Sequence, residues 1–223
     1  MKHLNIVLSL AAAVAGATLP GPSASGLPLP LGEMGWTGSI TPGGPVVQVW
    51  GADLDDIEAK IKKDHPEFSM YLDEPIQPLA SSENPALEAR EALSKRLNGN
   101  CDGRFGNAKV SGVNDGINSL RRVTAGCSAR ARTCIRTQCN HDAAIGLCND
   151  NYHDITVRCT DVANMAEEIR KSCHWVKFPH VCPPGRPCTI TDHWSHGQEF
   201  ARAGPWNVIV GTCGFFGGGS RPV

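Results

Sequence analysis

The sequence predicts an α+β fold: a small disulfide-rich two-layer α/β sandwich in which two helices cover one face of a mostly antiparallel sheet. Three observations predict this class. All ten cysteines lie between Cys101 and Cys213, an apolar N-terminal run predicts export to an oxidising compartment, and the cysteine-rich part contains two helical and three strand-like patterns. Cysteines in such a compartment form disulfides, which stabilise domains with modest cores.

The N-terminus has the pattern of a signal peptide. Met1-Lys2-His3 is a short basic start, residues 4–14 are mostly apolar, and residues 15–17 are the small residues that a signal peptidase accepts. The apolar run is shorter than the roughly 20 residues that cross a bilayer. We therefore expect residues 1–17 to be removed and the product to be secreted and extracellular.

A dibasic pair divides the rest of the chain. Lys95-Arg96 stands just before the first cysteine, and a furin or kexin-type protease cuts after such pairs. We predict a cysteine-free pro-region, residues 18–96, and a mature disulfide-rich domain, residues 97–223. Residues 19–96 carry 12 acidic and 6 basic side chains, a net charge of −6, and residues 97–223 carry 10 and 14, a net charge of +4. The acidic pro-region either covers a basic surface or guides folding, or it is a solvated leader.

The pro-region contains a few local signals. Residues 18–34 are rich in Pro, Gly, Ser and Leu, which predicts an extended linker. Residues 46–50 predict a short strand. An amphipathic pattern with acids in its first turn predicts a helix at 53–61, and a second, polar helix is expected at 85–94.

The mature domain has two clear helical patterns. Apolar residues recur every three or four positions through 110–123, and again through 160–172, where Thr160 is the expected N-cap. Strands are expected at 143–148, 154–157 and 206–210. Residues 174–196 are expected to be a long loop held by Cys182 and Cys188. Helices and strands in this order favour helices packed on one face of an antiparallel sheet.

Ten cysteines close five bridges with none left over, and their spacing leaves the pairing open. Zinc ligation through Cys134 with Cys139, or Cys182 with Cys188, is the alternative. The oxidising compartment favours disulfides, so we expect no metal and no cofactor. The expected disulfide cysteines are Cys101, Cys127, Cys134, Cys139, Cys148, Cys159, Cys173, Cys182, Cys188 and Cys213.

A resemblance to a known group supports this fold. The helical residues 113–120 precede a cysteine-flanked stretch, 134–151, that ends in Cys148-Asn149-Asp150-Asn151. Together with a helix between two cysteines and a final strand ending in cysteine, these motifs resemble small secreted cysteine-rich fungal effectors, similar to killer-toxin-like and necrosis-inducing effector domains. The resemblance covers nearly all of residues 97–223 and none of the pro-region, and the loop at 174–196 departs from it. It implies a disulfide-bonded α/β sandwich that acts at a host or competitor interface by binding.

Histidines offer the alternative of an enzyme. His193 and His196 lie close in sequence to Asp192, Glu199 and Arg202, and histidine with a carboxylate serves as general acid and base in secreted ribonucleases. The opposing interpretation is that these are solvated loop groups. No Gly-x-Ser-x-Gly or His-Glu-x-x-His motif is present. We assign no catalytic residue.

Arginines gather in the first part of the mature domain. A positive face formed by them would suit an anionic membrane, an acidic glycan or a nucleic acid, and ordinary solvated arginines are the alternative. Few aromatic residues accompany them, so no base-stacking surface, and hence no nucleic acid, is expected. The residues are Arg121, Arg122, Arg130, Arg132 and Arg136.

Together these observations predict a monomeric, non-enzymatic fungal virulence effector or toxin-like protein. It is processed at Lys95-Arg96 by a kexin-type protease and binds a host or competitor surface protein, glycan or membrane component. A ribonuclease-like hydrolase and a cell-wall or adhesion protein are the alternatives.

Overall fold

The computed structural model describes residues 27–75, 99–177 and 192–217. The predicted signal peptide, the helix expected at 85–94, the predicted processing pair Lys95-Arg96, and Cys182 and Cys188 lie outside the described residues. Among the described residues, no helix is long and apolar enough to cross a membrane. The predicted α+β class is confirmed, with mostly antiparallel pairing, three helices and four disulfides in the described part of the chain.

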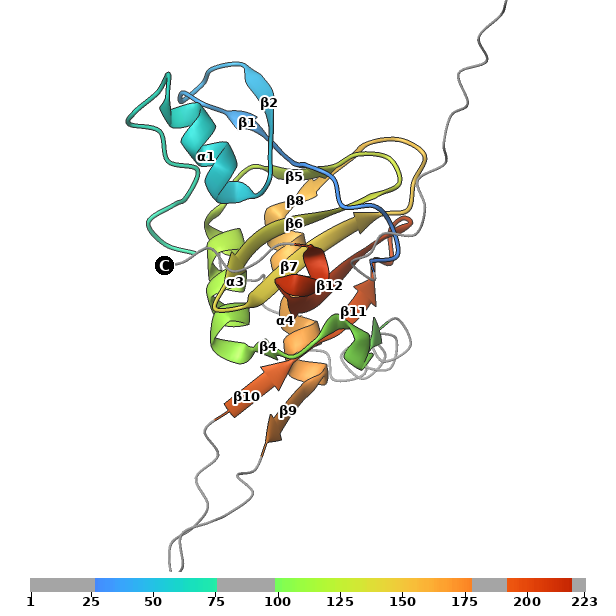
Figure 1. The fold of residues 1–223 in the computed structure, drawn as a ribbon. Coiled ribbons are helices and arrows are strands. Elements are labelled where there is room, and N and C mark those ends of the chain that lie inside the picture. The colour runs from blue at the N-terminus through green and yellow to red at the C-terminus, as the bar shows by residue number, and fades with distance from the viewer. Residues whose placement is uncertain (1–26, 76–98, 178–191, 218–223) are drawn as a thin grey trace, which may run out of the picture.

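A five-stranded antiparallel sheet forms the centre of the molecule (Figure 1). Its strand order is β3-β11-β12-β7-β6, so the last long strand of the chain lies in the middle. Strand β7 is buried along its whole length, which explains its continuous apolar sequence. The bounds are β3 (Gly99–Asn100), β11 (Gly197–Phe200), β12 (Trp206–Thr212), β7 (Ala143–Asn149) and β6 (Thr133–Asn140).

Helices α3 (Val110–Arg122) and α4 (Cys159–Ser172) pack against this sheet and against each other. Their apolar stripes share one buried cluster with Ile145 and Leu147 of β7. The predicted helices therefore agree with the observed ones to within one residue at each end. The predicted cap at Thr160 is wrong, because α4 begins at Cys159 and Arg158 is its N-cap residue. Arg158 and Asp161 form a double hydrogen bond, at 3.0 and 2.8 Å, across the first turn.

The alternate side chains of β7 and β12 belong to a second core. Ala144, Cys148 and Ile209 contact a buried cluster built by the short helices η1 (Gly103–Phe105) and η2 (Gly214–Phe216). Strand residues alternate between the two faces of a sheet, so the two cores lie on opposite faces. Phe216 lies directly on Gly146, where an added Cβ would meet the ring at 2.2 Å. Only glycine fits there.

Two smaller antiparallel sheets flank the central one, so the single sheet of the prediction is wrong. A four-stranded sheet has the order β2-β1-β5-β8, and a three-stranded one has β4-β10-β9. The ends of the predicted loop at 174–196 are the strands β9 and β10, which pair with each other. The bounds are β1 (Met34–Ser39), β2 (Val46–Gly51), β4 (Ala108–Lys109), β5 (Gly126–Ala129), β8 (Ile155–Arg158), β9 (His174–Lys177) and β10 (Asp192–Ser195).

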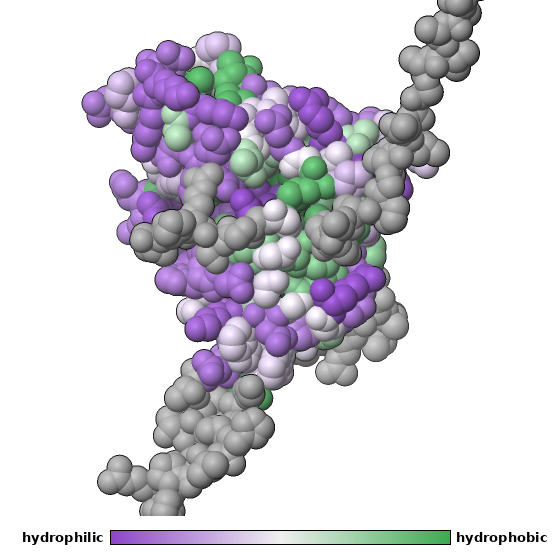
Figure 2. All heavy atoms as spheres, viewed as in Figure 1, coloured by the Kyte–Doolittle hydropathy of each residue, from purple (hydrophilic) through white to green (hydrophobic). Residues whose placement is uncertain are grey.

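Residues 27–75, hereafter the N-terminal segment, pack on the cysteine-rich part. The segment contains β1, β2 and the helix α1 (Leu54–Lys62), and β1 pairs with β5. Hydrophilic residues cover most of the outer surface of α1 (Figure 2). The strand and the first helix of the pro-region are thus found as predicted. The linker expected at 18–34 is wrong in its described part, because Leu27 and Leu29 are buried and β1 begins at Met34.

Four disulfides join the eight described cysteines to one another. They connect Cys101 with Cys173, Cys127 with Cys159, Cys134 with Cys148, and Cys139 with Cys213. All four lie within residues 99–217. Bridges that close long loops constrain the unfolded chain most, and two of these span more than 70 residues of sequence.

The pairing leaves Cys182 and Cys188 as the pair for a fifth bridge. Because each bridge removes two hydrogens, five bridges make the protein about 10 Da lighter than its reduced form. We expect this difference in intact mass before and after reduction. A difference of about 8 Da would show that Cys182 and Cys188 carry free thiols or ligate a metal.

One ion pair connects the two helices of the cysteine-rich part. Arg121 of α3 hydrogen-bonds Glu167 of α4, and both side chains are largely shielded from solvent. Lys171 lies 3.3 Å from the same carboxylate. Burial raises the pKa of Glu167, but the hydrogen bond and charge of Arg121, with the charge of Lys171, outweigh it and hold the pKa below its usual value.

This carboxylate makes the stability depend on pH. Its folded pKa is lowered, so its contribution is present above its ordinary pKa of 4.5 and is lost as pH falls through the folded value. We expect Glu167→Gln to be less stable than wild type at pH 7 in urea unfolding, and this deficit to shrink as the pH falls below 4.5 and through the lowered pKa of the folded state. The exposed Glu74→Gln is the control, expected to have no deficit. A Glu167→Gln deficit that stays constant down to the acid end would contradict this assignment.

Candidate binding surface

Two turns meet at one end of the central sheet. Here β6 begins, β7 and β11 end, and β12 begins. The backbone N–H of Asp150 donates to the carbonyl of Pro205 at 2.9 Å, and the Asn151 side chain donates to the same oxygen at 3.1 Å. The turn after β7 and the turn before β12 are thereby tied together.

Asn149 fixes the shape of this end from inside. Its side chain is fully buried, and its amide nitrogen donates to the carbonyls of Ala129, Arg130 and His153 at 3.2, 3.0 and 2.8 Å. Its amide oxygen accepts from the backbone and side chain of Asn151 at 2.9 and 2.8 Å. One side chain therefore bonds main-chain groups of three separate segments, which explains why the Cys-Asn-Asp-Asn motif carries asparagine here.

A buried polar chain supports the same end from the neighbouring strands. Gln198 of β11 donates to Asn207 of β12 at 2.9 Å, and Asn207 donates to the carboxylate of Asp150 at 3.0 Å. Gln198 and Asn207 are both nearly inaccessible to solvent. Buried polar networks that are satisfied in this way hold a single arrangement.

Tyr152 stands on this supported turn with 88% of its surface exposed. The guanidinium of Arg132 lies 5.4 Å from the centre of its ring. Arg132 has a φ of +55°, a backbone conformation that residues other than glycine rarely adopt. Its backbone N–H donates to the Asn151 carbonyl, and its guanidinium donates to the Asp150 carbonyl. Phe200, at the end of β11, is 44% exposed at the same end of the sheet. Arg132, Tyr152 and Phe200 are hereafter the Tyr152 edge.

The residue types at this edge are those of binding sites. Tyrosine and arginine are enriched among the residues that dominate the energy of protein interfaces, because each offers a large surface with few rotatable bonds or a fixed set of donors. Tyr152 is not among the site residues predicted from the sequence. The available signal was its position: it directly follows an Asn/Asp turn between two strands, where a large aromatic ring has no core to enter.

The five arginines of the predicted positive face have different neighbours. Arg121 pairs with α4, and Arg132 belongs to the Tyr152 edge. The other three, Arg122, Arg130 and Arg136, each contact the N-terminal segment. Their side chains differ in exposure. Those of Arg121 and Arg136 are each 13% exposed, whereas those of Arg130 and Arg132 are 52% and 45% exposed, so the alternative of solvated arginines still holds for these two.

The two histidines that the enzyme alternative would use, His193 and His196, have different neighbours in the structure. His193 lies 2.9 Å from His174, nitrogen to nitrogen, and their rings stack. His196 instead lies near Trp175, with 6.4 Å between the ring centres. Directly paired residues lie on the same face of a sheet, so Trp175 shares a face with Trp194. His193 is the neighbour of Trp194 along β10 and therefore points to the opposite face. The structure thus places His193 and His196 apart rather than in one site.

The other candidate partners lie on separate elements. Asp192 begins β10, Glu199 is in the middle of β11, and Arg202 lies in the turn after it. His141 lies 3.8 Å from Asp115 at the surface. Among the described residues, no group of three or more His, Cys, Asp or Glu side chains is placed to hold a metal.

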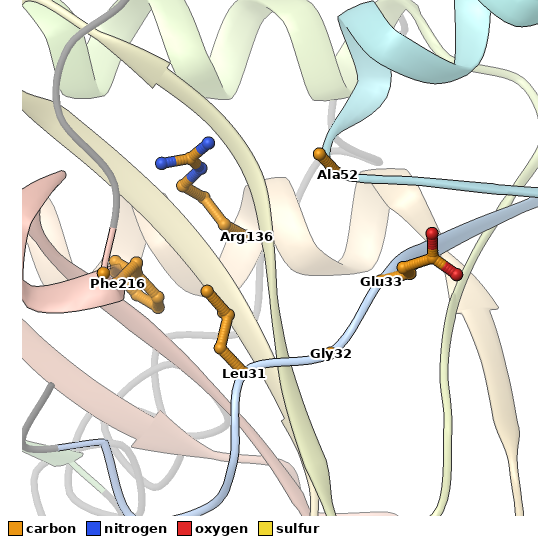
Figure 3. Close-up of a pocket in the computed structure, with 7 residues that line it drawn as sticks. Leu31, Gly32, Glu33, Ala52, Arg136 and Phe216 are labelled. Carbon is orange, nitrogen blue, oxygen red and sulfur yellow. The ribbon is translucent and has the colours of Figure 1, made fainter. Parts of the chain in front are cut away.

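A cavity of about 430 Å³ lies where the N-terminal segment meets β6 and η2 (Figure 3). Arg136 and Phe216 line one side of it, and Leu31, Gly32 and Glu33 line the other. The same Arg136 is paired with Asp53 at 3.3 Å, so the cavity marks the seam between the segment and the rest of the molecule.

Comparison with known proteins leaves the resemblance as a prediction. No protein-family model, curated protein or solved structure matches the chain. The candidate surface therefore depends on its own geometry.

Asn149 provides a test of how the edge is built. Asn149→Ala removes a donor from three carbonyls, of which that of Arg130 keeps the Thr133 hydroxyl as a donor. Each buried polar group left unpaired costs about 1–3 kcal/mol. We expect a fall of at least about 2 kcal/mol in the free energy of unfolding, measured by urea denaturation. Asn149→Asp should lose more, because it directs a carboxylate at the same carbonyls. The exposed Asn118→Ala is the control, and an Asn149→Ala variant as stable as that control would contradict the role.

Proposed function

We propose that this protein is a secreted fungal effector or toxin-like protein that acts by binding a target through the Tyr152 edge. The observation that carries the proposal is Tyr152 itself, an 88% exposed aromatic side chain on a turn held by the buried Asn149. A mobile exposed tyrosine would be unremarkable at a surface. A tyrosine presented by a fixed turn loses little conformational freedom when a partner covers it, so more of its contact energy becomes affinity.

Secretion and the toxin-like fold are part of the proposal. The N-terminal signal pattern and four disulfides support an oxidising destination. The packing of α3 and α4 against one core of the central sheet supports a sandwich similar to killer-toxin-like domains. The target would be a host or competitor surface protein, glycan or membrane component.

The geometry favours binding over hydrolysis. General acid–base catalysis needs its groups within hydrogen-bond reach of one substrate position, and the hairpin sends His193 and His196 to different surroundings. A ribonuclease-like hydrolase is tested by incubating the purified protein with RNA. Loss of cleavage in a folded His196→Ala variant would support that alternative.

The binding proposal is tested with fluorescently labelled full-length secreted protein. The probe is applied to plant leaf tissue, to yeast cells and to walls of the producing organism. We expect Tyr152→Ala to bind its target at least about tenfold more weakly while its unfolding midpoint stays unchanged, because truncating such an anchor typically costs about 2 kcal/mol or more. Val46→Ala is the matched control, since Val46 is 70% exposed and lies on the N-terminal segment.

Two results would overturn the proposal. Equal binding by Tyr152→Ala and wild type would remove the Tyr152 edge from the function. Retention on the producer's own wall, with no binding to the other cells, would favour the cell-wall or adhesion alternative.

A further inference from the structure

The N-terminal segment supplies a strand that the cysteine-rich part lacks. Strand β1 pairs antiparallel with β5, with Trp36 opposite Cys127, and β5 has β8 on its other side. Farther along, the backbone of Gly32 and Pro30 bonds both polar groups of Cys134 at 2.8 and 2.9 Å. Without the segment, β5 would become an open sheet edge with unpaired N–H and C=O groups.

The segment also shares the core of the cysteine-rich part. Met34, Trp36 and Ile57 are almost fully buried in the same cluster as Val123 and Ala129. Trp36 packs edge-on against Phe68 of the segment, with 5.5 Å between the ring centres. Removal of the segment would expose a contiguous apolar surface on both parts, and surfaces of that kind mark interfaces.

Three arginines of the cysteine-rich part contact the segment, and the Arg130 side chain among them stays 52% exposed. Arg122 donates to the Leu72 carbonyl at 2.6 Å, and the Arg130 guanidinium lies 4.0 Å from the centre of the Trp50 ring. Arg136 pairs with Asp53, whose side chain is 3% exposed. The net charges of −6 before the dibasic pair and +4 after it have the signs that such contacts require.

From these contacts we propose that the N-terminal segment stays bound after cleavage at Lys95-Arg96, as the second chain of a two-chain protein. This inference rests on the proposed processing. The segment contains no cysteine, so strand pairing, apolar contacts and the arginine contacts hold it, and no disulfide does. Its surface on the cysteine-rich part is β5 together with Arg122, Arg130 and Arg136. Strands β1 and β2 and helix α1 of the segment lie at the opposite end of the molecule from β9 and β10 (Figure 1), and Tyr152 remains exposed with the segment in place.

The test uses the full secreted chain after removal of its signal peptide. It is cut with a kexin-type protease, and two bands on both reducing and non-reducing gels show complete cleavage without a connecting disulfide. Size-exclusion chromatography and native mass spectrometry are then run over a dilution series. We expect one species with the summed mass of both pieces down to sub-micromolar protein. Elution of two separate species, with the cysteine-rich piece monomeric or aggregated, would overturn the inference.

A second form of the full chain tests this inference separately from the processing that it assumes. In this form, Lys95-Arg96 is replaced by the recognition site of a sequence-specific protease. A full chain that resists the kexin-type enzyme disproves the processing, and the replacement still decides whether the pieces remain together after a cut.

Variants identify what holds the pieces together. After cleavage, Trp36→Ala should release the segment at a concentration at least tenfold higher than wild type, because it empties the shared core beside Phe68. Val46→Ala, on the exposed part of the same segment, should not change the release. Equal release by Trp36→Ala and Val46→Ala would contradict the proposed interface, and the dilution of wild type gives a result even where Trp36→Ala fails to fold.

Discussion

Strand β5 is the element on which the rest of the structure depends. Only four residues long, it pairs with β1 of the N-terminal segment on one side and with β8 on the other. Its Cys127 is bonded to Cys159 at the start of α4. The Ser128 hydroxyl lies 3.0 Å from Thr37 and 2.7 Å from Thr156, so hydroxyls of three strands meet in a row. The N-terminal segment, the second helix and the turn into the central sheet all take their positions from this strand.

Local patterns predicted those elements whose own residues determine them. The helices at 110–122 and 159–172 carry an apolar stripe at helical spacing, and β12 is a run of β-branched residues. Strand β5, Gly126-Cys127-Ser128-Ala129, has neither alternation nor bulk, and only its partners make it a strand. The four disulfide pairings and the docking of residues 27–75 are also contacts between distant parts of the chain. Such contacts leave no local signal in one sequence.

The candidate site shows the same division. The Cys-Asn-Asp-Asn motif stands out in the sequence. The role of Asn149 as a buried support does not, because its side chain donates to three carbonyls elsewhere in the chain, two of which precede β6. Conversely, the enzyme alternative would need His193 and His196, which are close in sequence, to act together, and the structure gives them different neighbours. Alternation along β10 separates His193 from Trp194, and the hairpin partner of each then decides its neighbours.

The exposure of Tyr152 has a consequence for how such a protein evolves. A side chain with 88% of its surface in solvent contributes little to the packing that keeps the turn folded, while Asn149 beneath it accounts for the main-chain bonds. Substitutions at position 152 should therefore have almost no cost in stability. If the Tyr152 edge is the binding surface that we propose, its specificity can change while the scaffold beneath it stays the same, as in antibody loops.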